Sequence, residues 1–139
     1  MSHEDVEVVR QTIEAFNRDG LDAALEYLDP EVEWLAPPEW LEERLYKGHE
    51  GIRRLASQWD ENFDEYRLDP HEFMDAGHQV VGLVFQRGRI KGSHDPIEQR
   101  TGYLWEVRDG KGVRIQVYFS WEEALEAAGL SEQAGSGES

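Results

Sequence analysis

Residues 101–130 read TGYLWEVRDGKGVRIQVYFSWEEALEAAGL, and this stretch contains the strongest structural signals in the chain. Apolar side chains alternate with polar ones before and after a short charged segment, which is typical of strands that bury one face. Asp109-Gly110 in that segment is a strong hairpin signal because glycine tolerates positive φ. We therefore expect strands over residues 97–107 and 113–119, joined by a tight turn.

A short helix is expected directly after the second strand. Ser120 is a good N-cap, and Glu123 stands three residues later, as a capping box requires. Gly129 has the place that glycine prefers just after a helix, and Leu130 follows it. The pattern predicts a capped helix that includes residues 124–128.

One face of the predicted hairpin is wide, apolar and aromatic. The side chains expected on this face are those of Tyr103, Trp105, Val107, Ile115, Val117 and Phe119. A face of this kind must be covered, and the amphipathic helices earlier in the chain are the obvious cover.

The remaining elements place helices ahead of a run of strands. Apolar spacing predicts helices over residues 2–16, 21–28 and 50–63, and strands over residues 32–35, 67–76 and 80–89. This order predicts an α+β domain: a cone-shaped, curved, mixed and mostly antiparallel sheet, with the N-terminal helices packed on its concave face. We expect one domain over residues 1–130, and a disordered tail of Gly, Ser and Glu over residues 131–139.

Composition excludes several classes of function. Thirty acidic against fourteen basic residues give a formal net charge of −16, which argues against nucleic acid and anionic membrane surfaces as partners. The chain has no cysteine, so disulfides and thiol chemistry are excluded. With no signal-peptide pattern and no long apolar run, we expect a cytoplasmic protein.

Several segments together resemble a known family. They are Val9-Arg10, Phe16-Asn17, Leu28 to Trp34 (LDPEVEW), Tyr46 to Ile52 (YKGHEGI), Asp75-Ala76-Gly77, Val107 to Lys111 (VRDGK) and Glu123 to Leu130 (EALEAAGL). Over residues 4–130 the chain is similar to the nuclear transport factor 2 superfamily and, within it, to SnoaL-like domains. The resemblance implies a cone-shaped cavity, but the superfamily contains isomerases, cyclases, hydrolases, dehydratases and non-catalytic binders, so it does not decide activity.

The catalytic patterns of three relatives do not match this chain. Where a ketosteroid isomerase-like enzyme needs a tyrosine and two aspartates, the ungapped comparison puts Thr12, Trp34 and Tyr103, of which only Tyr103 could donate to an oxyanion. A SnoaL-type cyclase carries His-Trp-Asp where this chain has residues 115–117, Ile-Gln-Val. An epoxide hydrolase needs an Asp-Arg-Asp group with a tyrosine and an asparagine; Arg87 and Arg89 stand on an expected strand, but their ordered partners are not apparent in the sequence.

Aromatic and aliphatic side chains are candidates for the wall of a ligand cavity. The ligand-binding candidates are Trp34, Trp40, Trp59, Phe63, Phe85, Trp105, Ile115, Val117 and Phe119. Aromatic residues more often fill an ordinary core. Five tryptophans in 139 residues nevertheless also fit a flat apolar pocket, so both interpretations stay open.

Three polar residues are candidates for chemistry: Tyr103, Arg87 and His94. Arg87 would face the cavity if Phe85 does, and it would then need a carboxylate or an anionic ligand. The alternative is an Arg87 that extends into solvent at the sheet edge. His94 stands beside Asp95 in a predicted loop, which could tune it near neutral pH or be an ordinary solvated loop.

No metal site or cofactor is expected. His49-Glu50 begins like a zinc protease helix, but Arg53 stands where the second histidine must be. The glycines at 88 and 92 lack the strand-to-helix context of a phosphate loop. The expected partners are a small-molecule ligand and a second copy of the chain, bound through the outer sheet face around Leu104 and Tyr118.

The leading hypothesis is a protein of unassigned activity that binds a small apolar or aromatic molecule in the cone. The alternatives are an isomerase, cyclase or hydrolase that acts on a polyketide- or steroid-like substrate, and a structural dimer module whose cavity is filled by tryptophan. Whether the chain is an enzyme stays open, because the catalytic residues of its relatives are not matched.

Overall fold

Within residues 2–37 and 44–130, which the computed structural model describes, six strands form one curved sheet in the order β2-β1-β6-β5-β4-β3. The strands are β1 (Leu28–Leu35), β2 (Leu45–Lys47), β3 (Phe63–Asp75), β4 (Gln79–Ile90), β5 (Pro96–Arg108) and β6 (Lys111–Tyr118). Only β1 and β6 pair in parallel; the other neighbours are antiparallel. The α+β fold with a mixed, mostly antiparallel sheet is therefore confirmed.

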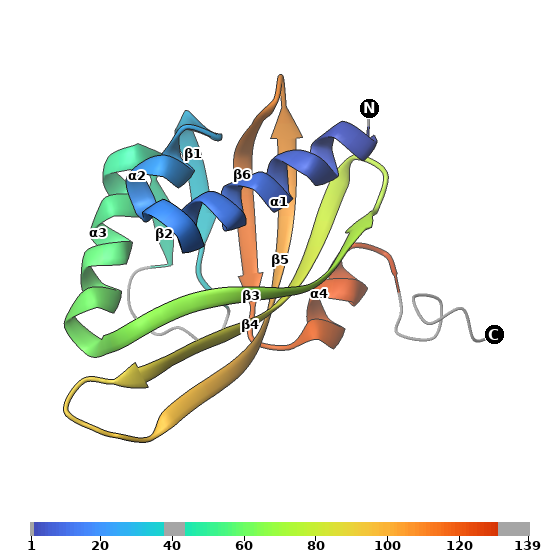
Figure 1. Ribbon diagram of the computed structural model, residues 1–139. Helices are drawn as coiled ribbons and strands as arrows, with labels where there is room; N and C mark the ends of the chain where they lie inside the picture. Colours follow the sequence, from blue (N-terminus) through green and yellow to red (C-terminus); the bar gives the residue numbers. More distant parts are fainter. Residues whose placement is uncertain (1, 38–43, 131–139) are drawn as a thin grey trace.

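Helices lie on both faces of this sheet, as Figure 1 shows. The concave face carries α1 (Ser2–Asp19), α2 (Leu21–Leu25) and α3 (Gly48–Asn62), whose apolar side chains join the main core. The opposite face carries α4 (Trp121–Ala127), which packs on β4 and β5 in a second, smaller core. Alternate strand residues supply the two cores, since successive side chains of a strand point to opposite faces.

The predicted β5–β6 hairpin is present. Asp109 and Gly110 form its turn with φ of 53° and 77°, and Arg108 pairs with Lys111. Positive φ at both central residues is what a two-residue hairpin turn needs. The ladder slips between Glu106 and Val107, so that Gly112 comes to lie against the Trp105 ring, where an added Cβ would stand 2.7 Å from Cζ3.

The predicted capped helix after the hairpin, α4, is also present. The Ser120 hydroxyl accepts a hydrogen bond from the Glu123 amide at the start of α4. At its end the amides of Gly129 and Leu130 donate to the carbonyls of Glu126 and Leu125, which is the Schellman pattern.

Four elements differ from the sequence-based expectation. Helix α2 ends at Leu25 rather than at residue 28, and β1 begins at Leu28 rather than at residue 32. The cause is tertiary: the Gly112 amide donates to the Tyr27 carbonyl, which draws this segment into pairing with β6. Strand β3 begins directly after α3, four residues earlier than expected, and β2 occupies part of an expected loop.

Some expectations fall on residues 38–43 and 131–139, which lie outside the described part of the chain. They concern Trp40 and the tail after α4. Across the described ranges, none of the helices combines the length and the apolar character that crossing a membrane requires. The cytoplasmic location stays a prediction.

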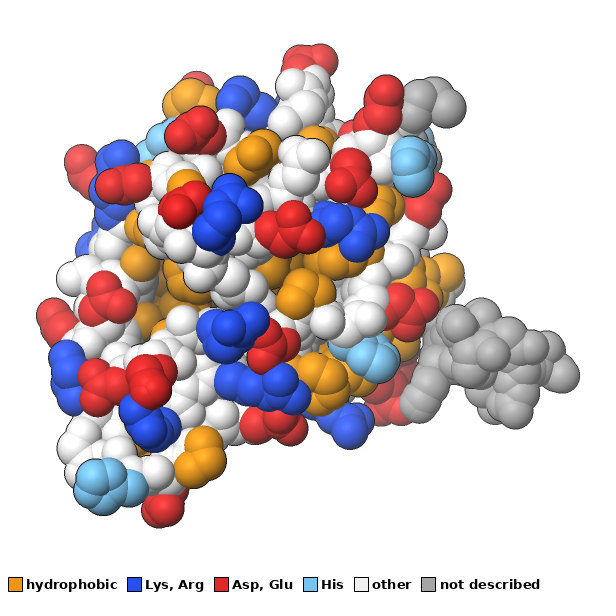
Figure 2. Space-filling model, viewed as in Figure 1, with side chains coloured by type: hydrophobic (Ala, Val, Ile, Leu, Met, Phe, Trp, Pro, Cys, Tyr) orange, Lys and Arg blue, Asp and Glu red, His pale blue; other side chains and the backbone are white. Residues whose placement is uncertain are grey.

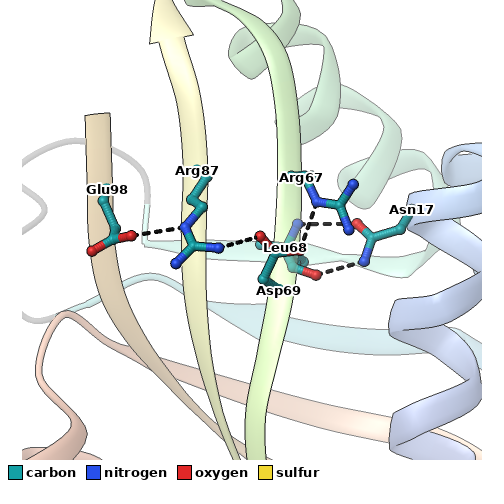
Figure 3. A network of polar contacts seen from close by, with 6 residues as sticks. All are labelled: Asn17, Arg67, Leu68, Asp69, Arg87 and Glu98. Carbon is teal, nitrogen blue, oxygen red and sulfur yellow. Dashed lines mark hydrogen bonds and ion pairs between the residues drawn. The ribbon is translucent and has the colours of Figure 1, made fainter. Parts of the chain in front are cut away.

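One side chain joins α1 to the edge of the sheet, as Figure 3 shows. The Asn17 amide donates to the Leu68 carbonyl at 2.5 Å and accepts from the Leu68 amide at 3.0 Å. Asn17 thus pairs with edge strand β3 as a neighbouring strand residue would. Phe16, the residue before Asn17, and Leu68 both line one cavity on the concave side.

We expect Asn17→Ala to lower the free energy of unfolding by about 1–3 kcal/mol, because it leaves the main-chain amide and carbonyl of Leu68 without partners. Urea unfolding followed by circular dichroism measures this. Asn62→Ala is the matched control, since the exposed Asn62 donates only to a carbonyl of its own helix. Equal effects of the two substitutions would show that the Asn17–Leu68 pairing does not stabilise the fold.

Candidate functional site

The concave side of the sheet contains an apolar cavity of about 90 Å³, which we call the inner chamber. It lies between the sheet and helices α1, α2 and α3. Its wall is made by Thr12, Ile13, Phe16, Leu21, Ala24, Leu28, Trp34, Ile52, Leu55, Ala56, Trp59, Leu68, Tyr103, Trp105 and Ile115. In Figure 2 hydrophobic side chains are visible in a hollow between α1 and β3, with charged side chains around it.

A second, wider cavity of about 710 Å³, the outer chamber, lies at the other end of the concave side. Its wall is made by Trp34, Pro37, Gln58, Trp59, Glu61, Asn62, Phe63, Gln86, Ile90, Ile97, Gln99, Tyr103, Val117 and Phe119. Trp34, Trp59 and Tyr103 line both chambers, so they form the boundary between them. The two chambers together offer an apolar interior behind a more polar entrance.

Aromatic rings pack against one another around this boundary, edge to face in the two pairs that Trp34 forms. The Trp34 ring meets the Trp59 ring with centroids 6.1 Å apart and the Tyr46 ring at 5.6 Å. The Trp59 ring also meets Tyr66, at 4.8 Å. Such pairs stabilise a wall beyond the area that they bury. The boundary is thus built from large side chains held by one another.

The polar side chains of the outer chamber are chiefly amides. The Gln58 carbonyl oxygen accepts from the Tyr46 hydroxyl at 3.0 Å, and the Gln86 carbonyl oxygen accepts from Thr101 at 2.9 Å. The Gln99 amide donates to the Phe119 main-chain carbonyl at 2.9 Å. These hydrogen bonds fix the amides while leaving each with unused hydrogen-bonding capacity among the described residues.

Two tyrosines near the boundary are held in the protonated form. Burial raises the pKa of Tyr103 well above its ordinary value. Burial also raises the pKa of Tyr66, Tyr103 raises it further, and the Gln86 amide partly offsets the shift. The Tyr66 hydroxyl is buried without a hydrogen-bond partner among the described residues, although the Gln86 amide is near enough to offset part of the pKa shift.

Most residues predicted to bind ligand are brought together by the fold. Trp34, Trp59, Trp105 and Ile115 line the inner chamber, and Trp34, Trp59, Phe63, Val117 and Phe119 line the outer one. Tyr103 lines both. Their positions agree with the predicted cavity, and their role in binding stays a prediction.

Phe85, Arg87 and His94 are not brought to the chambers. Phe85 lies on the opposite face of β4, where its ring centroid is 5.0 Å from that of Trp121. Arg87 has the same orientation and binds Asp69 and Glu98 on the neighbouring strands, each at 2.7 Å (Figure 3). His94 is exposed in the turn between β4 and β5. The expectation that Phe85 faces the cavity is wrong, because the core residues Val80 and Val84 take the inward positions of β4.

The outer sheet face is partly covered. Leu104 is buried beneath α4, so it is not free to meet a second copy of the chain. Tyr118 is half-buried at the margin of the same cluster. A homodimer through this face stays a prediction, and Leu104 is removed from the residues that would form it.

Sequence reasoning missed the amides and Tyr66. Gln86 could have been found, because it is in phase with the inward-facing Val80 and Val84. Gln99 is similarly in phase with Tyr103 on β5. The inward orientation of Tyr66 could not be predicted from alternation along the strand, because β3 slips in register between Asp64 and Arg67.

The family is shown by a sequence comparison. The model of the SnoaL-like domain matches residues 9–115 of this sequence. The chain belongs to the SnoaL-like domain family. A search of curated proteins found no significant match.

Solved structures agree with this assignment. An NTF2-like protein of unknown function from Burkholderia pseudomallei is 24% identical with a TM-score of 0.74, covering 88% of this chain and 95% of its own. TerC, crystallised with polyporic acid, is 22% identical with a TM-score of 0.73 and coverages of 91% and 98%. A candidate SnoaL-like polyketide cyclase from Jannaschia is 18% identical with a TM-score of 0.71, covering 91% of each chain. Likeness at these identities shows a shared SnoaL-like fold.

Charged groups are scarce in the chambers. Tyr103 and Glu61 are the only ionisable side chains among the described residues that line them, and Glu61 is exposed at the entrance. Within the described ranges no three His, Asp or Glu side chains are grouped to hold a metal ion. The arrangement is suited to apolar contacts and uncharged hydrogen bonds.

We expect the free energy of unfolding to fall as the pH rises above about 10. The raised pKa values keep Tyr66 and Tyr103 protonated in the folded state, while the unfolded chain ionises at the ordinary value, so their stabilising contribution is complete below pH 10. Each tyrosine would contribute a slope of up to about 1.4 kcal/mol per pH unit. Urea unfolding between pH 8 and 11 should show a shallower slope in the double variant Tyr66→Phe/Tyr103→Phe than in the wild type. Equal slopes would contradict the assignment.

Proposed function

We propose that this SnoaL-like domain binds a small, largely apolar or aromatic molecule along the concave side of its sheet. The observation that carries the proposal is the inner chamber, whose wall of aliphatic and aromatic side chains opens into the outer chamber past Trp34, Trp59 and Tyr103. An apolar cavity with a few polar groups is the usual form of a small-molecule site. Open space remains beside Trp34, Trp59 and Tyr103. This argues against the alternative of a structural module whose cavity is filled by tryptophan side chains.

Binding is better supported than catalysis. Isomerase, cyclase and hydrolase chemistry each need a group that takes or gives a proton, placed within hydrogen-bonding reach of the reacting atom. Among the described lining residues, Tyr103 is held protonated by burial and Glu61 is exposed at the entrance. Neither Arg87 nor His94 reaches the chambers. An enzyme acting on a polyketide- or steroid-like substrate is the second candidate.

Two structural neighbours are consistent with a ligand in this fold. TerC was crystallised with polyporic acid, and the Jannaschia protein is a candidate polyketide cyclase. Both are below 25% identity, so they support a ligand-binding fold in general and do not identify the molecule that this chain takes.

Val117→Trp should abolish binding of an uncharged apolar probe such as N-phenyl-1-naphthylamine. Val117 is 2% exposed and lines the outer chamber next to Tyr103 on the neighbouring strand, so a larger side chain there enters the space that a ligand would occupy. Probe fluorescence measures binding, and circular dichroism with thermal unfolding checks that the variant is folded.

Gln116→Trp is the matched control, because it adds the same side chain at the next residue, which points to the other face of β6. This variant should bind the probe like the wild type. A folded Val117→Trp protein with unchanged affinity would remove the outer chamber from the binding site. Wild-type protein that does not bind apolar aromatic probes at all would contradict the proposed function.

A further inference from the structure

The inner chamber is bordered by a closed wall on the sheet side and an incomplete wall on the helix side. The residues that the strands contribute to it are all buried: Leu28, Trp34, Leu68, Tyr103, Trp105 and Ile115. On the helix side, four lining residues are only half-buried: Phe16, Leu21, Ala56 and Trp59. These four belong to α1, α2 and α3, so the chamber approaches the molecular surface where the three helices meet. Hydrophobic side chains are visible in a hollow on this side of the molecule in Figure 2.

Local structure explains why the helix wall is incomplete at this place. Gly20 turns the chain sharply between α1 and α2, with φ of 93°. Helix α3 lines the chamber with residues 52, 55, 56 and 59, which is the spacing of one helix face. Ala56 has the smallest side chain of that face. A small side chain near a turn in the helix layer leaves space that a larger side chain would fill.

Exposed parts of the lining occur at two separate places along α3. The outer chamber has exposed lining residues at the end of this helix, Glu61 and Asn62, and at the end of β4, Ile90. Ala56 precedes Asn62 by six residues, which corresponds to about 9 Å along the helix axis. Trp59 lies between them and lines both chambers. The path from one exposed place to the other therefore runs beneath α3.

The sizes of the two chambers decide which part of a ligand each one accepts. The inner chamber has about 90 Å³, whereas a closed apolar cavity that takes up benzene has about 150 Å³. The outer chamber has about 710 Å³, which is within the range of about 300–1,000 Å³ for small-molecule sites. A ring therefore suits the outer chamber, and a narrow alkyl chain suits the inner one.

From these observations we propose that the inner chamber has a lateral opening between α1, α2 and α3, beside Ala56, and that an alkyl chain of the ligand passes through it. The ligand class is an elongated apolar molecule, with its bulkier part in the outer chamber and an unbranched chain beneath α3. The end of the chain emerges between Phe16, Leu21 and Ala56, so the depth of the cavity does not limit chain length. This inference rests on the proposed binding function and names the shape of the molecule that is bound.

The test uses introduced thiols, which are the only thiols present because the chain has no cysteine. Folded Ala56→Cys protein is treated with dodecyl methanethiosulfonate, which links an alkyl chain to the thiol through a disulfide. The tethered chain should enter the passage and weaken binding of N-phenyl-1-naphthylamine by about 10-fold or more, since a tethered group acts at an effective concentration of about millimolar. Probe fluorescence measures the affinity, mass spectrometry the extent of modification, and circular dichroism the fold.

Three further variants or reagents complete the test. Leu21→Cys, on α2, is a second, independent variant with the same expected loss after dodecyl modification. Methyl methanethiosulfonate places the same disulfide at residue 56 without the chain and should leave probe affinity unchanged. Ala127→Cys carrying the dodecyl chain is the matched control, because Ala127 is exposed on α4, which packs on the opposite face of the sheet. It should bind the probe like the wild type.

The lateral opening is overturned if dodecyl-modified Ala56→Cys and Leu21→Cys bind the probe as well as their methyl-modified forms do. It is also overturned if neither thiol reacts in the folded protein under conditions that modify Ala127→Cys completely. In both of these cases the wild type still binds the probe and the proposed function stands. A wild type that does not bind the probe contradicts the proposed function as well.

Discussion

The pairing of Asn17 with Leu68 is the constraint on which the concave side depends. An amphipathic helix laid across a curved sheet could slide along it, because apolar contacts have no direction. The Asn17 amide removes that freedom by forming two hydrogen bonds, of 2.5 and 3.0 Å, with the main chain of edge strand β3. Helix α1 is thereby fixed at the margin of the sheet, and the space beneath it is bordered by Phe16 and Leu68.

The two faces of the sheet are packed in different ways, and the difference separates structure from function. On the outer face an added Cβ at Gly102 would lie 2.4 Å from that of Ala124, and the Trp121 indole donates to the Val84 carbonyl at 3.1 Å. Asp69 and Arg87 add an ion pair between strands there. Burial raises the pKa of the Asp69 carboxyl, but hydrogen bonds from Arg67 and Arg87 outweigh it and hold that pKa below its usual value.

The concave face is closely packed at some points, such as Gly112 against Trp105, but it is not filled. It contains two cavities, and among the described residues the buried polar atoms without partners, Tyr66 Oη and Trp105 Nε1, both belong to side chains packed in its core. A protein under selection for stability alone would fill such space and pair such groups, because each unmet donor costs about 1–3 kcal/mol. Both unpaired groups therefore lie on the face that contains the two chambers, as a binding site there requires.

Much of this arrangement could be predicted from the sequence because local rules govern it. Alternation predicted the inward-facing Tyr103, Trp105, Ile115 and Val117, and the capping signals predicted α4. The prediction for Phe85 was wrong because its strand is apolar on both faces, so hydrophobicity alone could not assign a phase. The early start of β1 could not be predicted, since it depends on pairing with residues far along the chain.

The polar residues of the concave side could not be predicted from local sequence patterns either, because their orientation depends on strand register. Tyr66 joins the core of the concave side only because β3 slips in register between Asp64 and Arg67. Gln86 and Gln99 face inward, but a polar residue within a strand is usually taken for its solvent side. Which donors stay unused is a property of the packed structure, because the sequence does not state which partners each group will find.

The central claim is that the concave side admits a small apolar molecule, and nuclear magnetic resonance of the tryptophan indole N–H groups tests it directly. In a titration with tetralin, the account predicts that the indole signals of Trp34, Trp59 and Trp105 shift, because these residues line the chambers. The indole signal of Trp121 should stay in place, since its N–H is bound to the Val84 carbonyl on the opposite face. A titration that moves only Trp121, or none of the four, would contradict the account.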